Sequence, residues 1–130
     1  MDLAADSTNT AALKFYSIEE DSLSQDWTSL PPREWAWCNP PFSHIQPWVK
    51  KAYESKQRIV MLLPASVGAN WWRDWVHNKA RILCLNGRIT FGGCTQSYPK
   101  DCVLLQYAPY IIPAYKIWSW NEDVDPVAPE

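Results

Sequence analysis

The tetrapeptide Asn39-Pro40-Pro41-Phe42 combines residue types that could do chemistry on an amine. Neither proline can donate a backbone hydrogen bond, and Pro41 pushes Pro40 toward an extended conformation. A stiff turn of this kind leaves carbonyl oxygens free to face a ligand. If the Asn39 side-chain oxygen and the Pro40 carbonyl accepted the protons of an adenine amino group, its nitrogen would become more tetrahedral and could attack a methyl donor. Phe42 would then stack on the base.

An adenine amine inside a duplex is out of reach of an enzyme, so the base would have to be flipped out of the stack. Aromatic stacking helps to hold a flipped base, which is the role that this interpretation gives to Phe42. The alternative is an ordinary proline turn that closes a buried strand. A tetrapeptide alone does not decide between the two, because short motif matches carry false positives.

The turn resembles the [Asn/Asp/Ser]-Pro-Pro-[Tyr/Phe/Trp] signature of amino-methyltransferases that use S-adenosylmethionine. Further stretches are similar to those of the small phage-type Dam DNA adenine methyltransferases and occur in the same order. They are Asp2-Leu3-Ala4-Ala5-Asp6, Asp21-Ser22-Leu23 with Trp27, Met61-Leu62-Leu63-Pro64-Ala65, Trp71-Trp72 and Gly87-Arg88-Ile89-Thr90-Phe91. The ordered set is much more specific than the tetrapeptide, and it covers most of the chain.

The resemblance implies a role for each matching residue. It assigns the chemistry to Asn39, Pro40, Pro41 and Phe42, and the binding of S-adenosylmethionine to Asp2, Ala4, Asp6 and Asp21. From the residues themselves, Asp6 could equally be a helix N-cap, and Asp21 could be part of a solvated acidic turn. The chain departs from the family where Ala4-Ala5 replaces glycines, and where an N-terminal strand and helix with a Trp-x-Thr-Pro element is missing.

The elements around the turn form a strand, a helix and a second strand. Trp35 to Cys38 predicts a short buried strand that ends at the turn, and Ser43 is the expected cap of the next helix. Apolar residues then recur at helical spacing, namely Ile45, Trp48, Val49, Ala52 and Tyr53. Arg58 to Pro64 is a nearly continuous apolar run, which predicts a central parallel strand. The loop from Ala65 to Asn70 should therefore lie beside the turn.

The second half of the chain predicts another helix and a pair of strands. Trp71 and Trp72 open the helix, and both cannot face inward, so Trp71 is a candidate for the pocket rim and for a DNA contact. Strands are expected at Arg81 to Leu85 and Val103 to Tyr107, with the latter as the last, antiparallel strand. Between them, Arg88 and Lys100 are candidate nucleic-acid contacts, although a structural ion pair is as probable for Arg88.

These elements predict an α/β fold, a single-domain Rossmann-like methyltransferase sheet that is mostly parallel and N-terminally shortened. We expect the domain to cover residues 1–120, followed by an acidic, proline-containing tail at 121–130. The length of 130 residues fits one domain. The tail is expected to pack up to Trp120 and to fray beyond it.

Bulk properties exclude some classes of function. The net charge of −2 argues against strong nonspecific nucleic-acid binding, although it allows a local basic rim. The four cysteines lack Cys-x-x-Cys or paired His spacing, so no metal site is predicted. The chain shows neither a signal-peptide pattern nor an apolar run of membrane length. A cytoplasmic protein is expected, in a bacterial host if the resemblance to phage enzymes holds.

Three hypotheses about function remain at this point. The first is an adenine-specific methyltransferase that acts on double-stranded DNA with S-adenosylmethionine. The second is a shortened, catalytically silent relative that acts as an interaction or inhibitor protein, with a host protein as its partner. The third is methylation of RNA or of a protein glutamine through the same turn. The nine tryptophans further predict exposed rings and hence self-association into a homo-oligomer.

Overall fold

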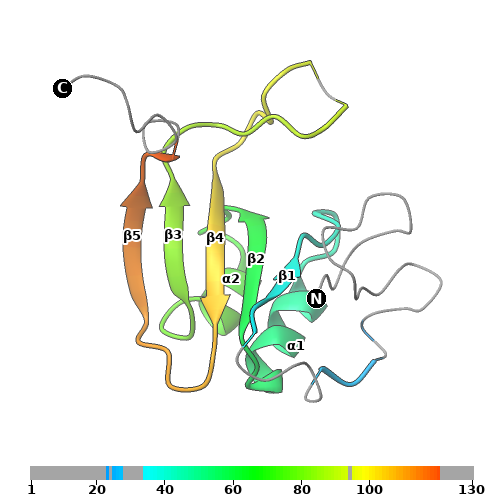
Figure 1. Ribbon diagram of the computed structural model, residues 1–130, viewed down its shortest axis with the longest axis vertical. Coiled ribbons are helices and arrows are strands. Elements are labelled where there is room, and N and C mark those ends of the chain that lie inside the picture. The colour runs from blue at the N-terminus through cyan, green and yellow to red at the C-terminus, as the bar shows by residue number, and fades with distance from the viewer. Residues whose placement is uncertain (1–22, 24, 28–33, 94, 121–130) are drawn as a thin grey trace.

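The computed structural model describes residues 23, 25–27, 34–93 and 95–120. A five-stranded sheet in the order β1-β2-β4-β3-β5 forms its centre (Figure 1). The strands are β1 (Ala36–Cys38), β2 (Ile59–Pro64), β3 (Arg81–Leu85), β4 (Cys102–Tyr107) and β5 (Ala114–Trp118), and the helices are α1 (Gln46–Ser55) and α2 (Asn70–Trp75). The expected α/β class is confirmed, and so are the two strands that flank α1.

The sheet is mixed, whereas a mostly parallel sheet was predicted. β1 pairs in parallel with β2, and β3 pairs in parallel with β5. β4 lies between β2 and β3 and runs antiparallel to both, so the other four strands share one direction. The expectation that the antiparallel strand is the last one is wrong, because β5 follows it and adds a parallel edge. The chain up to Trp120 joins the sheet through β5, and the Trp120 indole donates to the Gly87 carbonyl at 3.1 Å.

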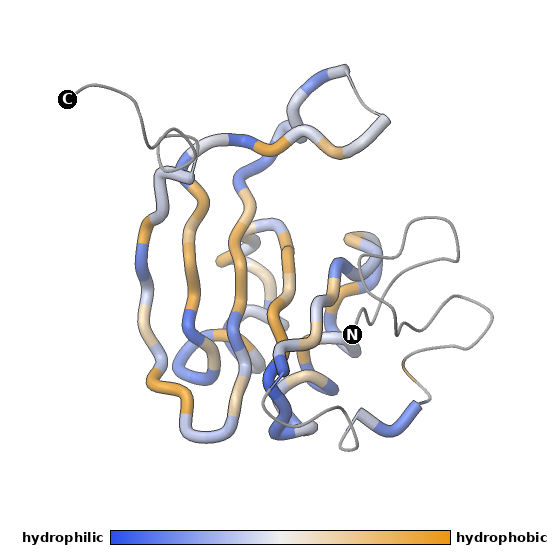
Figure 2. The backbone as a smooth tube through the Cα atoms, in the orientation of Figure 1, coloured by the Kyte–Doolittle hydropathy of each residue, from blue (hydrophilic) through white to orange (hydrophobic). Residues whose placement is uncertain are grey.

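The core lies between one face of the sheet and the two helices. Alternate residues of the two central strands point into it and are fully or almost fully buried, namely Ile59, Met61 and Leu63 from β2 and Val103, Leu105 and Tyr107 from β4. Trp48, Val49 and Ala52 of α1 and Trp72 of α2 belong to the same cluster. Figure 2 shows the apolar character running along β2, β3 and β4, with polar segments between them.

The helix α1 begins two residues later than a Ser43 cap would require. Its N-cap residue is Ile45, which makes no side-chain cap hydrogen bond, and Pro47 occupies the first turn. Ser43 lies instead in the turn that the His44 amide closes on the Pro41 carbonyl at 3.4 Å. The prediction for Ser43 is therefore wrong, because the chain uses the residues after Phe42 to complete this turn before it enters the helix.

Candidate active site

The turn after β1 leaves two hydrogen-bond acceptors unengaged. Pro40 is buried, Asn39 and Phe42 are half-buried, and Pro41 is exposed. The Pro41 carbonyl accepts from His44, as described above. Within the described part of the chain, neither the Asn39 side chain nor the Pro40 carbonyl has a hydrogen-bond partner. The turn is thus closed without consuming the two oxygens that could bind an amine.

Phe42 contacts two aromatic rings from a distant part of the sequence. Its ring centroid lies 5.5 Å from that of Tyr98 and 6.1 Å from that of Phe91, with interplanar angles of 69° and 70°. Phe91 and Tyr98 also meet edge to face, at 5.8 Å. T-shaped pairs in this range are favourable beyond simple burial. The three rings therefore fasten the turn after β1 to the connection between β3 and β4.

That connection, between Leu85 and Cys102, leaves the sheet at the end where the carboxyl termini of β1, β2, β3 and β5 lie. Figure 1 shows it rising beyond the ends of β3 and β4 and reaching toward the β1–β2 side of the sheet. The Ala65 amide, in the loop after β2, donates to the Asp101 carbonyl at 2.9 Å. Three connections therefore converge at the carboxyl ends of parallel strands, which is where open α/β sheets bind their ligands.

Comparison with known proteins gives the family of this chain. Residues 1–121 match the family DNA N-6-adenine-methyltransferase (Dam). The chain belongs to this family. It is 34% identical over 93 residues to the DNA N-6-adenine-methyltransferase of Escherichia phage T1, a match that covers 69% of this chain and 38% of the relative. It is also 30% identical over 119 residues to the protein of the same name from Haemophilus phage HP1 (strain HP1c1), covering 84% of this chain and 66% of the relative.

The chain thus spans less than two thirds of the length of these two Dam relatives. No solved structure matches it at a significant level. In the described residues, no helix is long and apolar enough to cross a membrane. In the same residues, no group of three or more His, Cys, Asp or Glu side chains gathers where it could hold a metal ion.

The structure locates some of the Dam-family site residues and not others. It places Asn39, Pro40, Pro41 and Phe42 together in one turn at the end of β1, as predicted. The four residues assigned to the cofactor, Asp2, Ala4, Asp6 and Asp21, lie outside the described residues. The expected split between the paired tryptophans is confirmed, because Trp72 is 4% exposed while Trp71 is half-buried beside it. A DNA contact of Trp71 stays a prediction.

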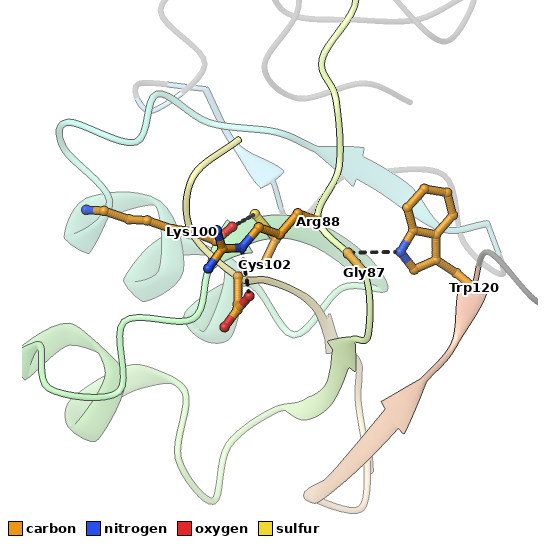
Figure 3. A network of polar contacts seen from close by, with 6 residues as sticks. Gly87, Arg88, Lys100, Cys102 and Trp120 are labelled. Atoms are coloured by element: carbon orange, nitrogen blue, oxygen red, sulfur yellow. Dashed lines mark hydrogen bonds and ion pairs between the residues drawn. The ribbon is translucent and has the colours of Figure 1, made fainter. Parts of the chain in front are cut away.

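The two cations of the connection differ in their surroundings. Arg88 donates from Nε to Asp101 at 3.4 Å, and both side chains are largely exposed, which matches the ion pair considered for Arg88. In the described residues no carboxylate pairs with Lys100, which is exposed. Figure 3 shows its side chain extending away from Arg88. An exposed ion pair contributes little stability, so it leaves Arg88 able to exchange its partner for a phosphate.

Sequence reasoning did not find Tyr98, and it read Phe91 only as the end of a matching stretch. Both lie about fifty residues or more from Phe42 along the chain in a connection without periodicity, which is the kind of segment that pattern analysis treats as a loop. The one local signal was the number of aromatic residues between two strands. A ring within a polar connection needs a packing partner, but the sequence does not say which partner.

Two cysteines and Tyr107 are held in their neutral forms. Burial raises the pKa of the Cys84 thiol, and burial together with the nearby Asp101 raises that of Cys102. Burial also raises the pKa of the Tyr107 hydroxyl far above its ordinary value, and this hydroxyl donates to the Trp75 carbonyl at 2.6 Å. None of these three groups is poised for acid–base chemistry near neutral pH.

Proposed function

We propose that this protein transfers a methyl group from S-adenosylmethionine to the exocyclic amine of a flipped adenine in DNA. The observation that carries the proposal is the turn after β1, in a chain of the Dam family, where the Asn39 amide and the Pro40 carbonyl are left without partners in the described residues. Two acceptors on one rigid turn match the two protons of an adenine amine. Both relatives are named as DNA N-6-adenine-methyltransferases, which supports the same substrate.

The turn acts on the amine by accepting its protons. An adenine amine is a weak nucleophile because its lone pair is delocalised into the ring. When the Asn39 side-chain oxygen and the Pro40 carbonyl each accept one N–H, the nitrogen is held in a tetrahedral geometry and its lone pair is directed away from the ring. Rigid acceptors of this kind stabilise the positive charge that develops on the nitrogen, without reorganising during the reaction.

Phe42 supplies the position of the base. It is half-buried and is held by T-shaped contacts with two other rings, which would fix its position for stacking on a flat base. A base held in one orientation needs no covalent intermediate, because orientation alone lowers the barrier of a two-reactant step. Stacking also compensates for the energy that base flipping costs.

S-adenosylmethionine would supply an electrophilic methyl group on a cationic sulfonium. As the amine nitrogen bonds to that carbon, the carbon–sulfur bond would break, the sulfur would leave as a neutral thioether, and one amine proton would pass to water. The described residues at the carboxyl ends of the parallel strands fit a sulfonium cation. Their carbonyl oxygens carry partial negative charge, and their aromatic rings attract cations. Asp2, Asp6 and Asp21 are proposed to contact the polar ends of the cofactor, and all three lie outside the described residues. We expect calorimetry with the purified protein to show binding of S-adenosylmethionine.

The decisive experiment incubates the protein with double-stranded DNA and S-adenosylmethionine and measures N6-methyladenine by mass spectrometry. Asn39→Ala should lower the transfer rate by about 10²–10³-fold, by analogy with the loss of one donor from an oxyanion hole, while thermal unfolding stays unchanged. Asn78→Gly is the matched control, because Asn78 is exposed and has a φ of 60° that glycine adopts freely.

Two outcomes would contradict different parts of the proposal. Equal activity of the wild-type protein and Asn39→Ala would refute the role of the turn. A folded wild-type protein that binds no S-adenosylmethionine and forms no N6-methyladenine would refute the enzymatic function, and would favour a relative that only binds a partner.

A further inference from the structure

The connection between β3 and β4 is held at both of its ends. At the start, the Asn86 amide donates to the Trp118 carbonyl at 2.8 Å and the Trp120 indole donates to the Gly87 carbonyl. At the end, the Asp101 carbonyl accepts from the Ala65 amide. Figure 3 shows the Trp120 contact with Gly87, and Arg88 from the start of the connection pairs with Asp101 at its end. The residues between them therefore project from a fixed base.

The middle of the connection folds back on itself and leans on the active-site turn. The Tyr98 amide donates to the Ile89 carbonyl at 2.7 Å, and the hydroxyls of Thr90 and Ser97 face each other at 3.4 Å. Gly93 takes a φ of +84° near the tip, a conformation that glycine adopts without strain. The Phe91 and Tyr98 rings contact Phe42. A base stacked on Phe42 would consequently have this connection as its neighbour.

The side chains on the outside of the connection are neutral and rich in hydrogen-bonding groups. Those of Thr90, Thr95, Gln96 and Ser97 are exposed, and the Gln96 amide has no hydrogen-bond partner within the described residues. From Gly87 to Lys100 the sequence contains two cations and no acid, although the whole chain has a net charge of −2. The acid nearest to this stretch, Asp101, pairs with Arg88.

This division of groups fits the two kinds of contact that a protein makes with DNA. Cations position the protein on the phosphates, whereas neutral amides and hydroxyls read the base edges. Arg88 and Lys100 stand near the two ends of the connection, and the neutral groups lie between them. Glutamine can bind the edge of an adenine through two hydrogen bonds in the major groove.

We propose that residues 88–93 and 95–100 form the element that reads the bases beside the target adenine, with Gln96 as a residue that determines specificity. The three-ring contact with Phe42 sets the distance between the read bases and the flipped one. Lys100 contacts a phosphate and adds affinity without preference for sequence. This proposal rests on the proposed methyl transfer to DNA, and it names the part of the chain that selects the site.

The test maps sequence preference. Phage genomic DNA is methylated with limiting amounts of protein, and the methylated adenines and their flanking bases are identified by sequencing that detects N6-methyladenine directly. The variants are Gln96→Ala, the triple change Thr95→Ala, Gln96→Ala and Ser97→Ala, and Lys100→Ala. Gln57→Ala is the control, since Gln57 lies in the turn between α1 and β2. This turn is at the amino end of β2, whereas the β3–β4 connection is at the carboxyl end of β3.

Gln96→Ala should lower discrimination at one flanking position by about fivefold or more, the lower end for loss of a two-bond base contact. The dependence of DNA binding on salt should stay as in the wild-type protein. Lys100→Ala should weaken binding to all sequences alike and reduce the slope of log K against log salt by about 1. Gln57→Ala should change neither quantity.

An unchanged preference in the folded triple variant would overturn the proposal, and the methylation that it still performs would leave the proposed function standing. If the wild-type protein forms no N6-methyladenine, the proposed function fails first and the inference fails with it. Circular dichroism of each variant separates these outcomes from loss of the fold, which is not expected because all three side chains of the triple variant are exposed.

Discussion

The protein contains two clusters of aromatic rings with similar geometry and different surroundings. In the first, the core cluster, Tyr53 lies 6.0 Å from Trp75 and 6.4 Å from Tyr107. In the second, the site cluster, Phe42, Phe91 and Tyr98 are separated by 5.5 to 6.1 Å. The core cluster joins α1, α2 and β4, whereas the site cluster joins two connections at the edge of the sheet. Ring distances alone do not tell them apart.

The two clusters differ in the polar groups and cations around their rings. The Tyr107 hydroxyl in the core cluster donates to the Trp75 carbonyl in a partly buried hydrogen bond, whereas the Tyr98 hydroxyl has no partner within the described residues. Lys56 and Lys79 place their ammonium groups over the Tyr53 ring, and Lys50 lies over Trp75. In the described part of the chain no cation covers a ring of the site cluster. The core cluster thus combines the buried Tyr107 with covering lysines, whereas all three rings of the site cluster are half-buried and no lysine covers them in the described residues.

The largest expected effect separates the clusters by stability. Tyr107→Ala should lower the free energy of unfolding by about 3–5 kcal/mol, the range for removing a large aromatic side chain from a packed core, since Tyr107 is 2% exposed. Tyr98→Ala should lower it by about 1 kcal/mol, the centre of the range for single substitutions. Urea unfolding measures both. Equal losses in the free energy of unfolding would mean that the two clusters contribute equally to stability.

The next effect is on activity, to which we expect the site cluster to contribute more than the core cluster. Tyr98→Ala removes two T-shaped pairs worth about 0.5–1.5 kcal/mol each, which corresponds to a loss of roughly tenfold in kcat/KM for methyl transfer. Because Tyr98 acts through Phe42 as a positioning residue, the fluorescence of 2-aminopurine at the target base should change together with kcat. A structural role alone would leave the fluorescence of the bound duplex as in the wild-type protein.

Two variants control this result. Tyr98→Phe keeps the ring and should restore activity and fluorescence. Tyr110→Gly removes a tyrosine that is 100% exposed and has a φ of 63°, and it should leave both readouts unchanged. Normal fluorescence in Tyr98→Ala would contradict the link between the β3–β4 connection and the base.

The smallest effect concerns the two hydroxyls. Tyr107→Phe should cost about 0.5–1.5 kcal/mol, because it removes the partly buried hydrogen bond to the Trp75 carbonyl, whereas Tyr98→Phe should stay within about 0.5 kcal/mol. Burial raises the pKa of Tyr107 in the folded protein. Its contribution to stability is therefore fully present below the pKa of about 10 in the unfolded chain and is lost as pH rises above it.

The expected loss of stability at high pH can be measured directly. Above pH 10 the wild-type protein should lose up to about 1.4 kcal/mol of stability per pH unit through this group, and Tyr107→Phe should show a flatter decline. A wild-type stability that does not fall in this range would show that Tyr107 ionises freely in the folded state.

The sequence predicted the elements whose evidence is local. The apolar run of β2 and the helical spacing of α1 need only a few neighbouring residues to be recognised, and both elements were found. β5 was missed because Ala114 to Trp118 follows a proline-containing segment and becomes a strand only by pairing with β3, about thirty residues earlier. The helix start was misplaced because Ser43 is a good cap by type, while the turn before α1 uses it differently.

The site was predicted in the same uneven way. Asn39 to Phe42 could be placed at the end of a strand because rigid prolines and an apolar run are visible along the chain. The meeting of Phe42 with Phe91 and Tyr98 could not be predicted, since it depends on β4 returning between β2 and β3. The sequence therefore indicated what the turn could do to an amine, but not what lies beside it.

The β3–β4 connection also bears on how such proteins diverge. β3 and β4 are adjacent antiparallel strands, so the segment between them is a hairpin tip whose residues take no part in the sheet or its core. Evolution can exchange, lengthen or shorten the stretch between Arg88 and Lys100 without altering strand pairing, provided that two rings still reach Phe42. If the proposed roles hold, new target sites can then arise by replacing about a dozen residues, while the proposed methyl-transfer turn is inherited intact.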